Sequence, residues 1–320
     1  MDDFLAAVAV GYEVAIRAGL ALHRREAHYH ASGAWGAVGA AAAAARLLRL
    51  GDSETRHAIG LAEYHAPIAP VMRSVAAPAM TKDACGWGAF LGTSSALLAA
   101  GGFTAVPSAF LGETDGGHDL GARWHVLDVY VKEFPCCRWS HAPIRAALDL
   151  RRTSSLEADR IARVEVRSFA QVAEISRRLP RTTEEAQYSV VWPVAVALAH
   201  GRFGVEDVRE PAFADSVGRE LTARVDVTVD PSFDRAFPGR RLAQVRIERT
   251  DGVCVSSRVT EPPGEPDDPR LTAIVEAKVA AAEARPRASE LPDSLSHASL
   301  AELVIALTSA EATEAATDVA

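Results

Sequence analysis

The first 130 residues of the chain follow a helical pattern of apolar positions. Alanine and leucine recur in long stretches, and the pattern breaks at the glycine pair 101–102 and at the Pro-Ser pair 107–108. The opening segment carries acidic side chains within its apolar pattern, which is typical of a helix in a folded domain and not of a secretory signal. We therefore expect this half of the chain to be all helical.

Farther along, between about residues 160 and 260, apolar and charged residues alternate with a period of two. This alternation predicts half-exposed strands, and the sequence TDG within it predicts a hairpin turn. Two helical segments, at roughly 141–153 and 184–200, are interleaved with the strands, which indicates an α+β module. The predicted strand segments read IARVEVRSFA, ARVDVTVD and RLAQVRIERTDGVCVSSRVT.

The change of pattern predicts two domains in a mainly α protein. A proline-rich stretch, EPPGEPDDP at 261–269, is typical of a linker, and the segment LTAIVEAKVAAAEA behind it returns to a helical period. We expect a discontinuous helical domain formed by residues 1–132 and 268–320, with the α+β module inserted at residues 133–267.

Composition and charge narrow the classes of function. The chain has 320 residues, of which 48% are hydrophobic and 24% charged, and a net charge of -8. It offers no basic surface for nucleic acid. Its longest apolar run, Gly33 to Ala45, is too short to span a bilayer, so we expect no membrane segment. Few cysteines and no CxxC pair favour a reducing, cytoplasmic location.

Motifs for common cofactors and nucleophiles are missing from the sequence. It contains no Walker loop, no strand-linked GxGxxG, no GxSxG and no HExxH. The vicinal Cys136 and Cys137 lack a second pair and are poor candidates for a closed zinc site, which needs about four ligands. We expect no metal site.

A glycine- and alanine-rich stretch, AHYHASGAWGAVGAAAAAARLL at 27–48, follows directly behind a histidine pair. Ser32 is a good N-cap, so a helix is predicted from Gly33 to about Leu50, with His30 just ahead of its positive end. Free backbone N–H groups there attract carboxylates. The alternative is that the small residues serve tight helix packing and that His30 lies in a surface loop.

The segment MTKDACGWGA at 80–89 repeats this arrangement. Thr81 is predicted to cap a helix, which places Lys82 in the first turn, where the helix dipole disfavours a cation. Such a lysine favours an anion beside it. The alternative is a solvated lysine that pairs with the neighbouring Asp83.

A third segment, VKEFPCCRWSHAPIRAAL at 131–148, holds more cations. Ser140 is predicted to cap a helix that starts at His141. Lys132, Arg138 and His141 are expected to converge there.

Together these segments resemble the MmgE/PrpD family, which includes 2-methylcitrate dehydratase, cis-aconitate decarboxylase and iminodisuccinate epimerase. The resemblance implies a large helical domain with a smaller α+β lid, usually a homodimer, and a cofactor-free active site between the two domains. It runs in order through residues 6–19, 29–50, 80–89, 131–148, 184–201 and 249–269.

The resemblance also implies roles for particular residues. The family's histidine before the glycine-rich helix is matched by His30, its helix-start lysine by Lys82, and its lysine before the FP motif by Lys132. The family's reactions make or break a C–H bond beside a carboxylate, and cations lower the barrier by stabilising the extra negative charge. We expect the two lysines to hold carboxylates and the histidine to pass the proton.

Further residues are expected to contact the substrate. The family usually has a tyrosine where this chain has Trp192, which suggests a more apolar pocket and a changed substrate or reaction; Tyr188 lies one helical turn earlier. The predicted substrate-binding residues are Ser32, Arg138, His141, Tyr188 and Trp192.

The expected function is therefore that of a cofactor-independent lyase or isomerase, of dehydratase, decarboxylase or epimerase type. It would act on a small organic acid or a specialised metabolite. Family members also carry an additional N-terminal segment that contributes to the site. The alternative is therefore a non-catalytic or half-site subunit that needs a partner chain, such as a separately encoded N-terminal subunit, to complete the site.

Overall fold

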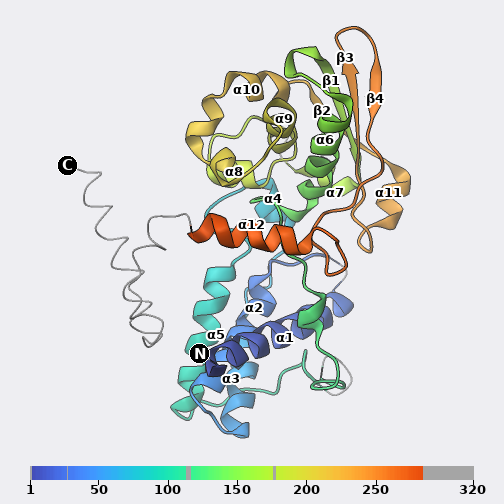
Figure 1. The fold of residues 1–320 in the computed structure, drawn as a ribbon. Coiled ribbons are helices and arrows are strands. Elements are labelled where there is room, and N and C mark those ends of the chain that lie inside the picture. Colours follow the sequence, from blue (N-terminus) through green and yellow to red (C-terminus); the bar gives the residue numbers. More distant parts are fainter. Residues whose placement is uncertain (1, 27, 113–116, 176–177, 284–320) are drawn as a thin grey trace, which may run out of the picture. The chain divides into compact units, whose positions relative to one another are not determined.

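The computed structural model describes residues 2–26, 28–112, 117–175 and 178–283, and the statements below concern these residues (Figure 1). Contacts divide the chain into one compact unit, residues 1–266, and a second unit, residues 267–320. The second unit contains α12 (Leu271–Glu283), a helix where the returning periodicity predicts one.

The first part of the larger unit is a group of packed helices. Helix α2 packs against α1, α3 and α5 (Figure 1). The helices are α1 (Asp2–Arg25), α2 (Gly33–Leu47), α3 (Asp52–Tyr64), α4 (Met72–Ala76) and α5 (Cys85–Ala100).

Small residues bring these helices into backbone contact. A Cβ at Gly39 of α2 would lie 2.4 Å from the carbonyl oxygen of Gly11 in α1. A Cβ at Gly92 of α5 would lie 2.2 Å from the carbonyl oxygen of Ala37 in α2. Glycine is therefore required at both positions, and the tight packing considered for the alanine-rich stretch is confirmed.

The prediction of an all-helical first half is wrong beyond Ala100. After the glycine pair, the described residues up to Cys137 are mostly irregular, apart from the 3₁₀ helix η1 (His125–Asp128). Pro107, Pro135 and several glycines lie in this segment and disfavour long helices.

By length and composition, α1 is apolar enough to cross a membrane, and 44% of its most apolar window is buried in the protein. The helix also carries a buried ion pair, in which Arg17 Nε lies 2.7 Å from Glu13 Oε1. Glu13 accepts a 2.9 Å hydrogen bond from Val126 N, and Arg17 Nη2 donates a 2.8 Å hydrogen bond to Arg123 O. Because these charges find partners in the irregular segment, α1 packs as a core helix.

The second part of the unit combines helices with a four-stranded sheet, so the protein is mainly α with an α+β part. The strand order is β2-β1-β3-β4; β2 runs parallel to β1, and the other two pairs are antiparallel. Val164 of β1 lies opposite Val225 on one side and Ile247 on the other. The strands are β1 (Ile161–Ser168), β2 (Val225–Val229), β3 (Gln244–Arg249) and β4 (Cys254–Ser256).

The predicted strands and the hairpin turn are confirmed. Helices α6 and α9 pack together and supply apolar side chains to the core that includes the sheet. The helix predicted over 184–200 is instead two helices with a break at 188–190. The helices of this part are η2 (Arg138–Ser140), α6 (His141–Ser154), η3 (Ala158–Arg160), α7 (Ala170–Glu174), α8 (Thr183–Gln187), α9 (Val191–His200), η4 (Val205–Val208), η5 (Glu210–Ala214), α10 (Ser216–Thr222) and α11 (Pro231–Ala236).

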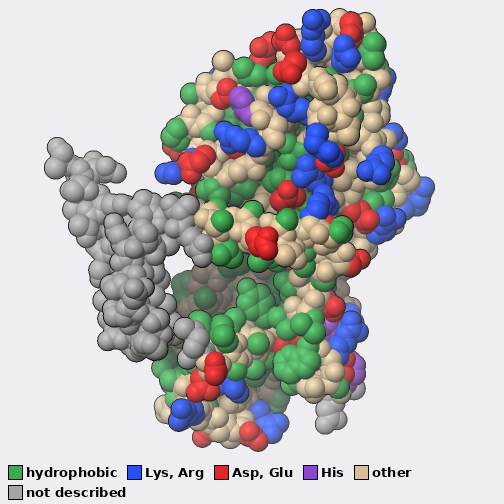
Figure 2. All heavy atoms as spheres, viewed as in Figure 1, with side chains coloured by type: hydrophobic (Ala, Val, Ile, Leu, Met, Phe, Trp, Pro, Cys, Tyr) green, Lys and Arg blue, Asp and Glu red, His purple; other side chains and the backbone are tan. Residues whose placement is uncertain are grey.

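The two parts of the larger unit differ in surface character on the face that Figure 2 shows. Hydrophobic side chains gather where Figure 1 draws α1 to α5, whereas lysine and arginine side chains are more frequent where it draws β1, β3 and α6. The domain boundary at residue 132, and the completion of the helical domain by residues 268–320, stay predictions.

Candidate functional site

A strained turn precedes α5 and carries Lys82. Lys82 has φ 49° and Ala84 has φ 57°, so two side-chain-bearing residues adopt the left-handed conformation. The predicted Thr81 cap is wrong, because α5 begins at Cys85 and Lys82 lies in the turn before it. Ser74 Oγ fixes the turn by donating a 2.9 Å hydrogen bond to Lys82 O. Such strain persists only where surrounding contacts enforce it, and it clusters at functional sites.

The Lys82 side chain faces the end of α8. Its ammonium donates a hydrogen bond to Gln187 Oε1 and lies 4.0 Å from Glu184 Oε1. The same ammonium lies 5.9 Å from the centre of the Tyr188 ring. Burial lowers the pKa of Lys82, and the charges of Glu184 and Asp83 act in the opposite direction.

Asp83 is engaged by a different partner from the one considered in the sequence. The phenol of Tyr188 donates a 2.7 Å hydrogen bond to Asp83 Oδ1. Burial, with this bond to Asp83, raises the pKa of Tyr188, so the phenol stays protonated. Lys82 and Asp83 therefore both contact the segment that ends α8.

The charge of Lys132 acts on the segment that contacts Gln187. The Lys132 side chain is exposed, and its charge acts on both Cys137 and His141. Cys137 N donates a 2.7 Å hydrogen bond to Gln187 O, and the charge of Asp83 also acts on Cys137. Both lysines thus lie around the contact between Cys137 and Gln187.

The vicinal cysteines are a buried thiol, Cys136, and a half-buried one, Cys137. Burial raises the pKa of Cys137 to about 11 and that of Cys136 further. A thiolate is the reactive form of cysteine, so neither residue is set up as a nucleophile.

His30 is buried, not in a surface loop. It is 3% exposed, and its Nδ1 has no hydrogen-bond partner among the described residues. The rings of His28 and His23 lie 4.2 and 5.6 Å from its own, between ring centres. Burial, then the charges of His28 and His23, lower the pKa of His30, so its imidazole is neutral near pH 7.

Backbone contacts link the segment of His30 to the Lys82 turn. His30 pairs with Pro70 in an isolated bridge, just before α4, and Ser74 of α4 contacts the Lys82 turn. The interactions described for the His30 ring join it to the other histidines. Its convergence with Lys82 and Lys132 in one pocket stays a prediction.

Ser32 lies where the first turns of α2 and α5 meet. Helix α2 begins at Gly33 as predicted, but the Ser32 side chain makes no capping hydrogen bond, and its Oγ lies 3.0 Å from Cys85 Sγ. Gly33 N donates a 2.8 Å hydrogen bond to Asp83 O. Two helix N-termini, each with a positive dipole end, therefore lie side by side next to the Lys82 turn.

Arg138 and His141 are held within the protein. Arg138 donates to Pro263 O and, at 2.5 Å, to Glu265 Oε1. His141 is fully buried, and burial, with Arg138 and Lys132 nearby, lowers its pKa to about 3. The predicted helix start at His141 is confirmed, while substrate contact by either residue stays a prediction.

Trp192 differs from expectation, whereas Tyr188 lies at the Lys82 turn. Trp192 is 0% exposed, its Nε1 donates a 2.8 Å hydrogen bond to Asp207 O, and its ring packs on Phe213. The structure therefore places Trp192 in the core and not against a ligand. Tyr188, one turn earlier, does reach the Lys82 turn.

Glu184 and Gln187 were not anticipated as site residues. Both lie in the segment EEAQYS, directly before the tyrosine that the sequence analysis singled out. Their proximity to that tyrosine was the available signal.

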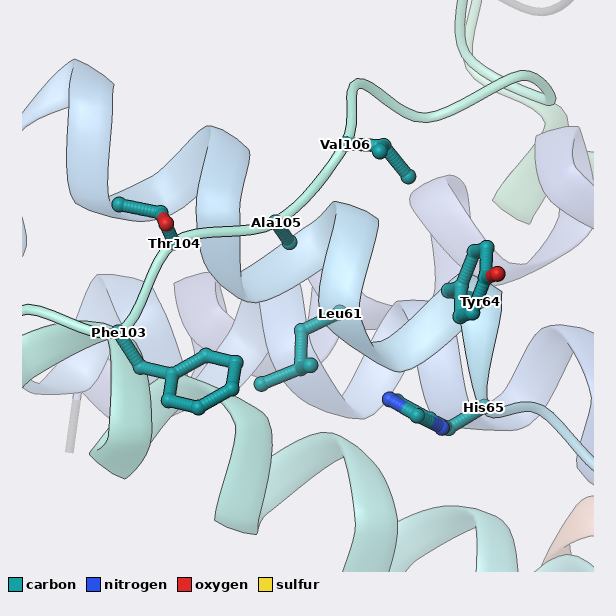
Figure 3. A pocket seen from close by; sticks show the side chains of 7 residues that line it. All are labelled: Leu61, Tyr64, His65, Phe103, Thr104, Ala105 and Val106. Carbon is teal, nitrogen blue, oxygen red and sulfur yellow. The ribbon is translucent and has the colours of Figure 1, made fainter.

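A separate cavity of about 210 Å³ lies at the end of α3 (Figure 3). The apolar side chains of Leu61 and Phe103 face it, and His65 lies at its edge. No lysine or arginine lines this cavity. It therefore suits a carboxylate less well than the lysine cluster does.

Comparison with known proteins shows the family of the chain. The MmgE/PrpD N-terminal domain matches residues 1–125, and the MmgE/PrpD C-terminal domain matches residues 134–290. The chain is 26% identical over 301 residues to a cis-aconitate decarboxylase of Aspergillus terreus (strain NIH 2624 / FGSC A1156), covering 82% of this chain and 60% of that protein. It is 24% identical over 304 residues to the cis-aconitate decarboxylase-like protein oryM of Aspergillus oryzae, covering 84% of this chain and 62% of that protein. The chain thus spans about three fifths of the length of these curated relatives.

Proposed function

Because the chain belongs to the MmgE/PrpD family, we propose that it is a lyase or isomerase that moves a proton beside a carboxylate of a small organic acid or specialised metabolite. Similarity to cis-aconitate decarboxylases supports a dehydratase- or decarboxylase-type reaction. Independence from metal and cofactor follows from the family resemblance and is part of the proposal.

The observation that carries this proposal is the placement of Lys82 beside two helix N-termini. The ammonium and the positive dipole ends of α2 and α5 favour an anion, and Gly33 N of α2 already donates to the backbone oxygen of Asp83. Removing a proton next to a carboxylate spreads further negative charge onto that carboxylate. Cations and backbone donors fixed in advance stabilise this charge more in the transition state than in the substrate.

Lys132 is proposed to hold the same carboxylate or a neighbouring group. A substrate carboxylate is a stronger acceptor than the Gln187 amide and replaces it at the Lys82 ammonium. Both lysines then act on the same substrate.

His30 is proposed to transfer the proton. Its buried imidazole is neutral near pH 7 and has an unpartnered Nδ1, as a general base requires. The neighbouring His28 and His23 disfavour the protonated form, so His30 passes its proton on readily.

Proton transfer is tested by deuterium incorporation. The purified chain is incubated in D₂O with 2-methylcitrate, cis-aconitate, iminodisuccinate and crotonate, and exchange and products are followed by NMR. We expect turnover or C–H exchange with at least one acid. This activity should be lost in Lys82→Ala. It should be retained in the control Lys278→Ala, which changes a lysine of α12. If none of the four acids shows C–H exchange or gives a product, the proposal is contradicted.

The partners are proposals as well. Trp87 and Phe90 on α5 are each 60% exposed, with their ring centres 5.3 Å apart and the rings tilted, and Leu97 farther along the helix is 57% exposed. This apolar face favours a protein partner, and we propose a cytoplasmic homodimer. Light scattering on the purified chain tests it: a dimer is expected, and a monomer contradicts it.

The same apolar face favours the alternative function, that of a half-site or non-catalytic subunit completed by another chain. Activity that appears only after a second chain is added supports the alternative. Full activity of the purified chain alone rules it out.

A further inference from the structure

We propose that Glu184 and Asp83 make this site selective for acids with a single carboxylate over tricarboxylates. The inference rests on the proposed function, since it assumes that Lys82 and Lys132 bind the substrate. It concerns the number of carboxylates on that substrate, which the two lysines alone do not determine.

The two lysines face an equal number of carboxylates. Glu184 Oε1 lies 4.0 Å from Lys82 Nζ, and the charge of Asp83, the next residue along the chain, also acts on that ammonium. Asp83 and Lys132 both act on Cys137, with opposite sign. At neutral pH the cluster of Lys82, Lys132, Asp83 and Glu184 therefore has no net charge.

Among the described residues, three nearby arginines are each paired with a carboxylate and so leave this balance unchanged. His30 and His141 stay neutral near pH 7, since their pKa values are lowered. The paired groups are Arg138 with Glu265 at 2.5 Å, Arg181 with Glu185 at 2.9 Å, and Arg145 with Glu133 at 3.1 Å.

A hydrogen bond holds the Asp83 carboxylate in a fixed position. The carboxylate accepts a 2.7 Å hydrogen bond from the neutral phenol of Tyr188, which brings no positive charge to offset it. A ligand with one carboxylate can pair with a lysine and direct its neutral groups toward Asp83 and Glu184. A ligand with three carboxylates brings at least one more negative charge against them, with no cation left to offset it.

The test compares three acids that differ by successive loss of a carboxylate: cis-aconitate, glutaconate and crotonate. Binding to the full chain is measured by isothermal titration calorimetry at constant ionic strength and pH 7.5. We expect crotonate to bind more tightly than cis-aconitate. Glu184→Gln should tighten cis-aconitate binding about tenfold, because one repulsive charge is removed, and should change crotonate binding much less.

Two further variants sharpen the test. Asp83→Asn retains an acceptor for the Tyr188 phenol and should shift selectivity in the same direction as Glu184→Gln. Glu185→Gln removes the same formal charge one residue away, from a carboxylate that pairs with Arg181, and should leave the ratio of the two affinities within about twofold of wild type.

The outcomes separate the two levels of the proposal. The charge selectivity is overturned if the wild type binds cis-aconitate more tightly than crotonate. It is also overturned if neither Glu184→Gln nor Asp83→Asn changes the ratio of the two affinities. In both cases the proposed function still stands. If none of the three acids binds to wild type or variants, both the selectivity and the carboxylate site are overturned.

Discussion

The phenol of Tyr188 donates a 2.7 Å hydrogen bond to the carboxylate of Asp83, across 105 positions of sequence. This bond joins the residue after α8 to the turn before α5. The hydrogen bond from Lys82 to Gln187 joins the same two segments. The α+β part is thereby attached to the helical part at the lysine cluster.

Removing this phenol should weaken the folded state. Tyr188→Phe leaves the Asp83 carboxylate without its donor, and a hydrogen bond to a charged group contributes about 1.5–3 kcal/mol. We expect a loss of that order in the free energy of unfolding, measured by urea denaturation. Tyr64→Phe, at a tyrosine that is 73% exposed, should change stability by less than about 0.5 kcal/mol. Equal effects of the two substitutions would refute the role assigned to the bond.

Lys82 should matter for the reaction far more than for the fold. Lys82→Ala removes a cation from the developing charge, and loss of one such donor typically lowers kcat by about 10²–10³-fold. Steady-state kinetics on whichever acid shows turnover measures the effect. The matched Lys278→Ala should keep wild-type kinetics, and a Lys82→Ala enzyme of unchanged kcat would remove the lysine from the mechanism.

Burial of His141 predicts how stability depends on pH. Its pKa is about 3 in the folded protein and about 6.5 in the unfolded chain, so between these values the unfolded state binds more protons. This contribution to stability is complete above pH 6.5 and is lost progressively as the pH falls toward 3.

Urea denaturation of wild type and His141→Gln at several pH values between 7 and 4 measures this dependence. We expect the variant to have a shallower fall, by up to about 1.4 kcal/mol per pH unit. The exposed His65→Gln should follow the wild type. Parallel pH profiles for wild type and His141→Gln would argue against a neutral, buried imidazole.

Two glycines of α5 should respond oppositely to alanine. At Gly92 the new methyl group would lie 2.2 Å from Ala37 O, so Gly92→Ala should destabilise the protein by about 1–3 kcal/mol. At Gly86 nothing lies within 4 Å, so Gly86→Ala should stabilise the helix by about 0.5–1 kcal/mol. Thermal unfolding of both variants checks this, and a tolerated Gly92→Ala would contradict the close approach of α5 to α2.

Features set by local sequence were predictable. The start of α2 at Gly33, the start of α6 at His141 and the turn between β3 and β4 all depend on signals within a few residues. The period-two pattern also located the strands, because one face of each is buried.

Features set by distant contacts were not predictable in this way. The left-handed turn at Lys82 has no glycine to announce it, and contacts to Ser74 and Gln187 hold it. The sequence analysis placed Trp192 in the substrate pocket, because its apolar ring suits a core as well as a pocket. Its hydrogen bond to Asp207 O, which the sequence does not reveal, holds it in the core. The site itself therefore needed tertiary structure.

The most direct test of the carboxylate site is protection of its lysines. The lysines of this chain are Lys82, Lys132 and Lys278, so an amine-reactive label read out by peptide mass spectrometry reports on the site with an internal control. With rising crotonate concentration, labelling of Lys82 and Lys132 should fall together with one midpoint, while Lys278 keeps its rate. Equal labelling of Lys82 and Lys132 with and without acid would contradict the account.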